Sequence, residues 1–150
     1  MAVTTHEAAL VALIDHLTAS LSCAVLRAAE FPEECPPEGV ANVRGEAAPE
    51  LDAEELGTGR KYWVRPIEID LASQLEDEAA GLALYEALLI EIGAALPNTE
   101  TLGGLVDAIR LGVPENAEEI AFEGTASIRG GFIPVDLYYT TSTNPLEVSQ

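Results

Sequence analysis

The stretch "IRGGFIPVDLYYTT", residues 128–141, alternates more regularly than any other part of the chain. Apolar side chains occupy every second position along it: Ile133, Val135, Leu137 and Tyr139. Polar or amphipathic side chains stand between them: Asp136, Tyr138 and Thr140. Successive side chains of a β-strand point to opposite faces of its sheet. This stretch therefore predicts a strand that buries one face and leaves the other in water.

A second stretch with the same period is "RKYWVRPIEIDLAS", residues 60–73. One face of this expected strand is apolar: Trp63, Ile67, Ile69 and Leu71. Glu68 and Asp70 share the other face, which is therefore expected to be solvated. Pro66 interrupts the pattern and has no N–H to donate to a neighbouring strand. It predicts that the strand lies at an edge of the sheet there, or that it contains a bulge.

Apolar residues recur at helical spacing in two further segments, residues 7–21 and 76–96. The first segment predicts an amphipathic helix with Thr5 as its N-cap. The second predicts a helix with a wide apolar face: Leu82, Leu84, Leu88, Leu89, Ile92 and Leu96. Pro97 directly after it is expected to end that helix.

The order of the elements predicts an α+β domain. Shorter strands are expected over residues 23–28, 40–44 and 105–111. With 150 residues, the chain is long enough for one domain and short for two, so residues 1–150 are expected to fold as a single unit. Alternating strands and short turns after helices favour a mostly antiparallel sheet of four to five strands. Both helices are expected to pack on one face of this sheet.

Two connections are acidic. The segment "GEAAPELDAEELGTG", residues 45–59, has few apolar anchors and is bounded by glycines. It predicts a long mobile loop that could hold one helical turn, and loops of this length are usually functional. Residues 112–126 are expected to form a second acidic connection.

The glycine pair in "TLGGLVDAIRLG", residues 101–112, could serve a phosphate, a helix cap or a turn. A phosphate-binding loop needs its glycines before a helix, so that the helix N-terminus faces the anion. Gly103 and Gly104 instead follow a helix, no P-loop lysine is near, and Asp107 would repel phosphate. The pair therefore predicts a reversal of the chain.

The charge balance excludes several classes of partner. Twenty-six acidic residues against seven basic ones leave a net charge of −19. A nucleic-acid interface needs a basic patch, and so does docking on anionic lipid. No apolar run approaches the length of a membrane span, so the chain is expected to be made and kept in the cytoplasm, or built into something assembled there.

No residue pattern points to catalysis or to a metal. Cys23 and Cys35 match no metal-binding spacing and are expected to be reduced thiols. His6 and His16 lie on nearly opposite helix faces and are expected to be solvated or at the helix edge. No serine has the setting of a hydrolase nucleophile. The sequence predicts no catalytic residue, no cofactor and no metal site.

The ordered set of stretches resembles a known family. These are "VLRAAEFPEECPPEG" (25–39), "RPIEIDL" (65–71), "TLGGLVDAIRLG" (101–112) and "EGTASIRGGFIPVDLYYTTSTNPL" (123–146). Together they resemble the tail terminator and minor tail proteins of long-tailed bacteriophages and of phage-like gene transfer agents. The resemblance covers nearly the whole chain, and Pro66 departs from it by interrupting the long strand.

The resemblance implies structural work rather than chemistry. Proteins of this family form a ring, commonly a hexamer, on the head-facing end of the tail tube. The ring ends tube growth and offers a surface to the head connector, and the family has no catalytic residues to carry over. The expected partners are therefore further copies of the chain, the tail tube protein and a neck or head-connector protein. DNA would pass through the channel without specific binding, and the protein would lie at the tail-neck junction of a particle assembled in the host cytoplasm.

Two groups of charged residues follow as candidates for assembly contacts. Acidic residues of the expected loop would contact a neighbouring subunit or the tube: Glu50, Asp52, Glu54 and Glu55. Some of the scarce cations would reach carboxylates on a neighbouring subunit or on the tube: Arg27, Arg44, Arg60, Lys61, Arg65, Arg110 and Arg129. The surplus acid would be concentrated on the outer surface and on the channel wall, where it offers DNA phosphates no counter-charge, or would be spread evenly for solubility.

Two alternative functions stay open at this point. A neck adaptor or head-completion protein would also form a ring within the particle. A small acidic cytosolic enzyme or adaptor would belong to a different class altogether.

Overall fold

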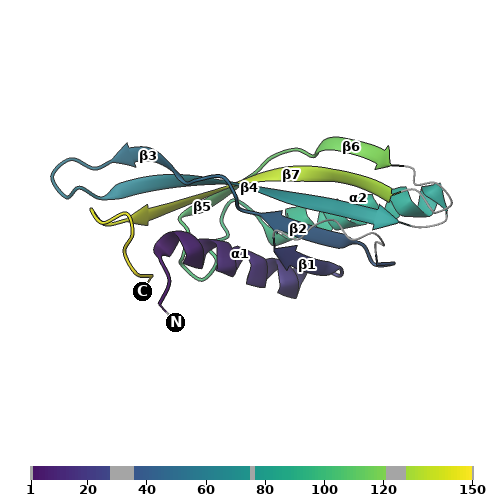
Figure 1. Ribbon diagram of the computed structural model, residues 1–150, viewed down its shortest axis with the longest axis horizontal. Coiled ribbons are helices and arrows are strands. Elements are labelled where there is room, and N and C mark those ends of the chain that lie inside the picture. The colour runs from purple at the N-terminus through teal and green to yellow at the C-terminus, as the bar shows by residue number, and fades with distance from the viewer. Residues whose placement is uncertain (1, 28–35, 75–76, 121–127, 150) are drawn as a thin grey trace.

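The computed structural model describes residues 2–27, 36–74, 77–120 and 128–149 (Figure 1). In chain order the elements are α1 (Thr5–Ser20), β1 (Ala24–Arg27), β2 (Val40–Arg44), β3 (Glu50–Glu54), β4 (Lys61–Gln74), α2 (Glu78–Ala95), β5 (Ala108–Leu111), β6 (Glu115–Ile120) and β7 (Ile128–Thr141).

The two long alternating stretches form the centre of the sheet. β4 and β7 pair antiparallel along their whole length, from Lys61 opposite Thr141 to Gln74 opposite Ile128. Figure 1 shows these two strands running from one end of the molecule to the other. Their alternation is confirmed, because the expected apolar face is buried at Ile67, Ile69, Leu71, Ile133, Val135, Leu137 and Tyr139.

Shorter strands extend this pair on both sides. The order is β1-β2-β4-β7-β5, while β3 pairs with β4 and β6 pairs with β7. Only the β1–β2 pair is parallel among the described strands; the other pairs are antiparallel. The α+β class is confirmed, but the sheet is mixed and has seven strands rather than four to five. The additional strands β3 and β6 lie in the two acidic segments that were expected to be loops.

Both helices pack on one face of the sheet. A single cluster of buried side chains joins Leu13 and Leu17 of α1, Leu88 and Ile92 of α2 and the inward face of the strands. Figure 1 shows the helices on the same side of the long strands. The predicted arrangement of the helices is therefore confirmed. On the other face of the sheet Glu68 is exposed, whereas Val40, Asn42 and Ala72 are buried.

The helix ends differ slightly from the sequence prediction. The N-cap of α1 is Thr4, not Thr5: its Oγ1 accepts a hydrogen bond from the Glu7 N–H at 3.2 Å. The inward face of α2 is centred on Tyr85, Leu88 and Ile92, whereas Leu82 is 41% exposed. Tyr85 lies one helical turn before Leu88 on the same face of α2. It fills the buried part of that face, where Leu82 was expected to contribute.

Two sequence predictions about the backbone are confirmed. Pro66 lies where β4 has no partner on one side, because β2 pairs only as far as Glu68 and β3 starts at Val64. The glycine pair turns the chain after α2: Gly103 and Gly104 have φ angles of 71° and 91°. Such positive angles strain residues that carry a Cβ atom.

The core contact of α2 gives a stability test. Leu88 is fully buried, and Leu88→Ala should lower the free energy of unfolding by roughly 2–5 kcal/mol, because it leaves a cavity. Ile90 on the same helix is 71% exposed, so Ile90→Ala is the matched control and should cost well under 1 kcal/mol. Urea unfolding of both variants measures the difference, and equal costs would show that the inward face is assigned wrongly.

Candidate functional site

The region that was expected to be a loop is a projecting β-hairpin. We call residues 50–64 the acidic hairpin: β3, the turn after it and the first residues of β4. All five residues of β3 are exposed. Leu56 in the turn is 96% exposed. Figure 1 shows the acidic hairpin extending beyond α1 at one end of the molecule.

The prediction of a long loop over residues 45–59 is wrong at Glu50–Glu54, which form β3. Since β2 stops pairing at Glu68, the first half of β4 has an open edge, and β3 pairs with it from Val64 to Lys61. The turn closes with a hydrogen bond from the Glu55 N–H to the Arg60 carbonyl at 2.8 Å. Backbone hydrogen bonds hold this strand although all of its side chains are exposed. The only sequence signal for it was the short alternation of Leu51 and Ala53 between carboxylates.

The four candidate carboxylates of the acidic hairpin differ in their contacts: two accept hydrogen bonds within the hairpin and two do not. Glu54 accepts a hydrogen bond from Lys61 at 2.8 Å, and Glu55 accepts one from the Tyr62 hydroxyl at 2.9 Å. Glu50 and Asp52 make no side-chain hydrogen bond or ion pair with the described part of the chain. The structure therefore leaves two of the four free for a partner, and the other two hold the hairpin together.

Three of the candidate cations are paired within the subunit. Arg27 donates to both carboxylate oxygens of Glu7, at 2.6 and 2.9 Å. Arg44 donates to Asp70 and lies 3.5 Å from Glu46. The hydrogen bond from Arg27 lowers the pKa of Glu7, and the hydrogen bond to Asp70 raises the pKa of Arg44. These pairs, with Lys61, use cations that were expected to reach a neighbouring subunit.

Arg65 is a structural residue of the interior, which corrects its assignment to an interface ion pair. Its side chain is buried and donates to the carbonyl of His6 at 2.7 Å and to the carbonyl of Gly45 at 3.0 Å. It therefore ties the first turn of α1 and the end of β2 to β4. Its position on the inward face could be predicted from the alternation of β4, because it lies between Trp63 and Ile67.

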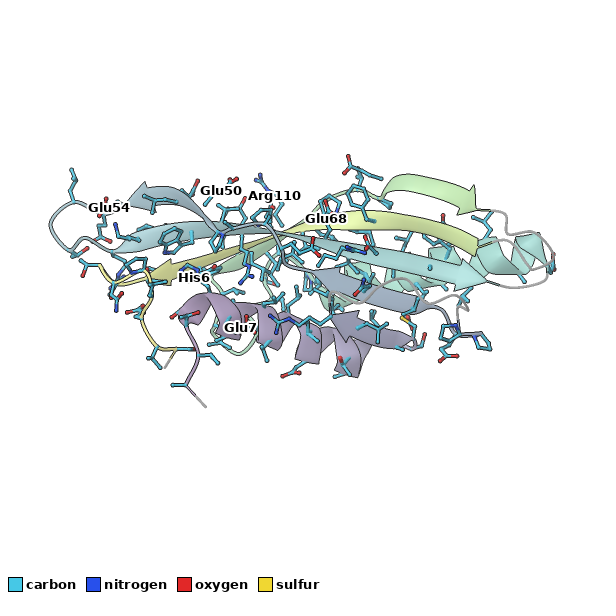
Figure 2. The ribbon with its side chains drawn as sticks, in the orientation of Figure 1. His6, Glu7, Glu50, Glu54, Glu68 and Arg110 are labelled. Carbon is cyan, nitrogen blue, oxygen red and sulfur yellow. The ribbon has the colours of Figure 1, made fainter. Side chains whose placement is uncertain are left out.

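Two exposed cations remain without a partner. In the part of the chain that the structure describes, neither Arg60 nor Arg110 makes an ion pair, and both are exposed. The side chain of Arg129 lies outside the described residues. Figure 2 shows Arg110 and Glu50 on the side of the sheet away from α1. Arg60 and Arg110 are thus the described cations that stay available for an assembly contact.

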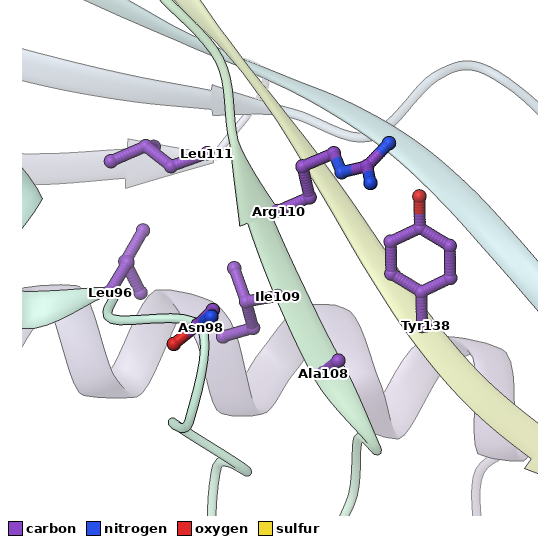
Figure 3. Close-up of a pocket in the computed structure, with 7 residues that line it drawn as sticks. All are labelled: Leu96, Asn98, Ala108, Ile109, Arg110, Leu111 and Tyr138. Atoms are coloured by element: carbon purple, nitrogen blue, oxygen red, sulfur yellow. The ribbon is translucent and has the colours of Figure 1, made fainter.

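A hollow follows the edge of the sheet at β5. It has a volume of about 570 Å³ and is lined by Leu96, Asn98, Ala108, Ile109, Arg110, Leu111 and Tyr138. Figure 3 shows these residues arranged around β5, with Leu96 and Asn98 on one side and Tyr138 on the other. β5 ends the strand order of the sheet, so this hollow lies along an edge with no further strand in the described chain.

The two histidines are structural and lie apart. His6 Nε2 lies 2.7 Å from the carbonyl of Pro145, and its Nδ1 lies 2.6 Å from the Tyr139 hydroxyl. Because the carbonyl can only accept, Nε2 carries the hydrogen and Nδ1 accepts from Tyr139. Burial raises the pKa of Tyr139 to about 12, so this hydroxyl stays protonated. His16 Nε2 reaches the carbonyl of Ala95 at 2.7 Å. Both histidines are half-buried, so of the two expected placements the solvated one is wrong, whereas their separation is confirmed.

Metal ligands, membrane-spanning helices and related proteins assign no function to this site. Among the described residues, no three His, Cys, Asp or Glu side chains are grouped as metal ligands would be. No helix in that part of the chain has both the length and the apolar character needed to cross a membrane. The sequence matches no protein-family model and has no significant match among curated proteins. The site must therefore be interpreted from its own geometry and charge.

The buried Arg65 gives a prediction about stability. Arg65→Met removes two hydrogen bonds from a charged donor and leaves two carbonyls without it, so unfolding should become easier by about 2–3 kcal/mol. Arg60→Met removes the same charge from an exposed position and should change stability by less than about 0.5 kcal/mol. Equal effects of the two substitutions in urea unfolding would contradict the structural role of Arg65.

The Glu7–Arg27 pair gives a pH-dependent prediction. Arg27 holds the pKa of Glu7 below 4.5, so its contribution is present above that pH and is lost as pH falls through the lowered pKa. Both side chains are more than a third exposed, so Glu7→Gln should cost at most about 1 kcal/mol at pH 7. The cost should shrink toward zero below about pH 4. Unfolding curves at pH 7 and pH 3.5 test this, and a cost that grows in acid would contradict it.

Proposed function

We propose that this protein is a ring-forming structural component of a long-tailed phage or phage-like particle. In this role it caps the head-facing end of the tail tube, ends tube growth and offers the joining surface to the neck or head connector. The ring is a homo-oligomer, with six copies as the resemblance implies. Each copy contributes a sheet with both helices on one face, which agrees with the fold that the resemblance implies.

One observation supports assembly more than any other. In the part of the chain that the structure describes, the sheet ends in open edges on both sides, and one of them carries the acidic hairpin, whose β3 strand is exposed at all five residues. A protein that acts alone usually protects such edges by covering or shortening them. Here the hairpin projects beyond the helices, where a neighbouring subunit or the tube can meet it (Figure 2).

The charge distribution supports the same role. Described cations are mostly paired inside the subunit, so the surface keeps an excess of carboxylates such as Glu50 and Asp52. An acidic channel wall offers DNA phosphates no counter-charge, so DNA would pass without binding. No membrane and no cofactor enter the proposed function.

Tube assembly in vitro tests this function. Tail tube protein of the same particle is polymerised with and without the purified protein, and tube lengths are measured by electron microscopy. We expect shorter tubes with a ring of added density at one end. The variant Glu50→Gln with Asp52→Asn should cap less well, whereas Glu86→Gln on the exposed face of α2 should act like the unchanged protein.

Two results would contradict the proposal. Unchanged tube lengths with no density at either end would exclude a terminator. Density found only on the portal side of the head, with no effect on the tubes, would assign the protein to the neck adaptors or head-completion proteins instead.

A further inference from the structure

We propose that copies of this chain join by adding the acidic β3 strand of one subunit to the open edge of β5 in the next. This inference rests on the proposed ring and specifies its contact. It concerns two surfaces at opposite edges of the same sheet, which makes the contact head-to-tail. Head-to-tail contacts generate a ring when the rotation between copies closes.

The backbone of β5 is free to accept a strand. The Gly112 N–H donates to the carbonyl of Pro134 at 2.8 Å, which continues the pairing of β5 with β7. Alternate residues of an antiparallel strand bond to the same neighbour. The N–H and carbonyl groups of Ile109 and Leu111 therefore point to the other side, where no strand of the described chain pairs. The hollow around β5 lies along this edge.

The two edges lie at the same level of the sheet. Glu50 is opposite Val64 in β4, Val64 is opposite Tyr138 in β7, and Tyr138 is opposite Ala108 in β5. Strand directions alternate from β3 through β4 and β7 to β5, since each of these pairs is antiparallel. The β3 strand of a following copy in the same orientation would therefore run antiparallel to β5 and continue the sheet.

The charges of the two edges are complementary. Arg110 pairs in register with Asp136, which is opposite Pro66, so it lies on the same face of the sheet as Glu50. Arg110 comes two residues after Ala108 on β5. When Glu50 of the next copy lies opposite Ala108, it is therefore the diagonal neighbour of Arg110. Diagonal neighbours on adjacent strands are within reach of long side chains. Both residues lack an ionic partner in the described part of their own chain.

The same charges disfavour the two symmetric contacts. Joining two β3 strands would place carboxylates such as Glu50 and Asp52 against their copies. Joining two β5 strands would bring two Arg110 side chains onto one short ladder. Like charges opposite one another destabilise a strand pair, whereas the head-to-tail contact brings opposite charges together.

A charge exchange tests the contact. Arg110→Glu and Glu50→Arg should each weaken self-association by about tenfold, measured by sedimentation and native mass spectrometry. The double exchange should restore the oligomer of the unchanged protein, because the pair is rebuilt with reversed signs. Glu86→Arg is the matched control for Glu50→Arg, since it makes the same charge change at an exposed position of α2. Single reversals without effect, or a double exchange that does not restore assembly, would overturn the contact.

Cross-linking gives a measurement that does not depend on these charges. Leu51→Cys and Asp107→Cys are made in separate preparations that also carry Cys35→Ser, and the two are mixed with a short bismaleimide. Leu51 is 50% exposed on β3, and Asp107 is exposed just before β5. The two positions lie opposite each other when Glu50 of the next copy is opposite Ala108. We expect a covalent dimer in the mixture, and much less when Leu51→Cys is mixed with Ala94→Cys on α2. Equal yields in the two mixtures would overturn the inference.

The outcomes separate this inference from the proposed function. A protein that cross-links selectively between β3 and β5 but never shortens tail tubes would overturn the function and support the contact. A protein that caps tubes while the charge reversals and cross-links show no preference would support the function and overturn the contact.

Discussion

The antiparallel ladder between β4 and β7 is the interaction on which the rest of the structure depends. It joins residues 61–74 to residues 128–141, which are far apart in the chain, and every other strand except β1 is attached directly to one of the two. Its inward side chains form the floor on which both helices pack. Breaking the ladder would remove the core and all of the open edges together, so stability and assembly share one origin.

A shortage of cations shapes the rest of the molecule. With seven basic residues for twenty-six acidic ones, only a few carboxylates can form an ion pair within the subunit. Arg27 and Arg44 are paired near α1 and β2, and Arg65 binds backbone carbonyls inside. Most of the remaining exposed charge is acidic, with Arg60 in the turn of the acidic hairpin and Arg110 at the edge of the sheet. A head-to-tail contact uses this asymmetry, because it brings the acidic edge to the cationic one.

The buried polar groups fasten the N-terminal helix to the sheet. Arg65 holds the carbonyl of His6, and the ring of His6 bridges Tyr139 and Pro145. Its centroid lies 5.0 Å from that of Trp63 in an edge-on arrangement. These contacts satisfy polar groups that would otherwise destabilise the interior. They also place the start of α1 beside the base of the acidic hairpin, so the projecting end of the sheet has a rigid support.

By itself, the sequence determined the elements whose side chains repeat with a clear period. The alternation in residues 60–73 and 128–141 predicted both long strands and their inward faces, and Pro66 predicted the open edge in β4. β3 was not predicted, because its alternation is short and weak: Leu51 and Ala53 stand between carboxylates, and both are exposed. The strand is held by backbone bonds to an edge of β4 that is created elsewhere in the fold. The alternation of β4 also places Arg65 on the inward face. Only the tertiary structure showed that Arg65 donates to the carbonyls of His6 and Gly45 there, while Arg110 stays exposed. Partner choice for a charged side chain depends on distances between strands, and a sequence does not contain those distances.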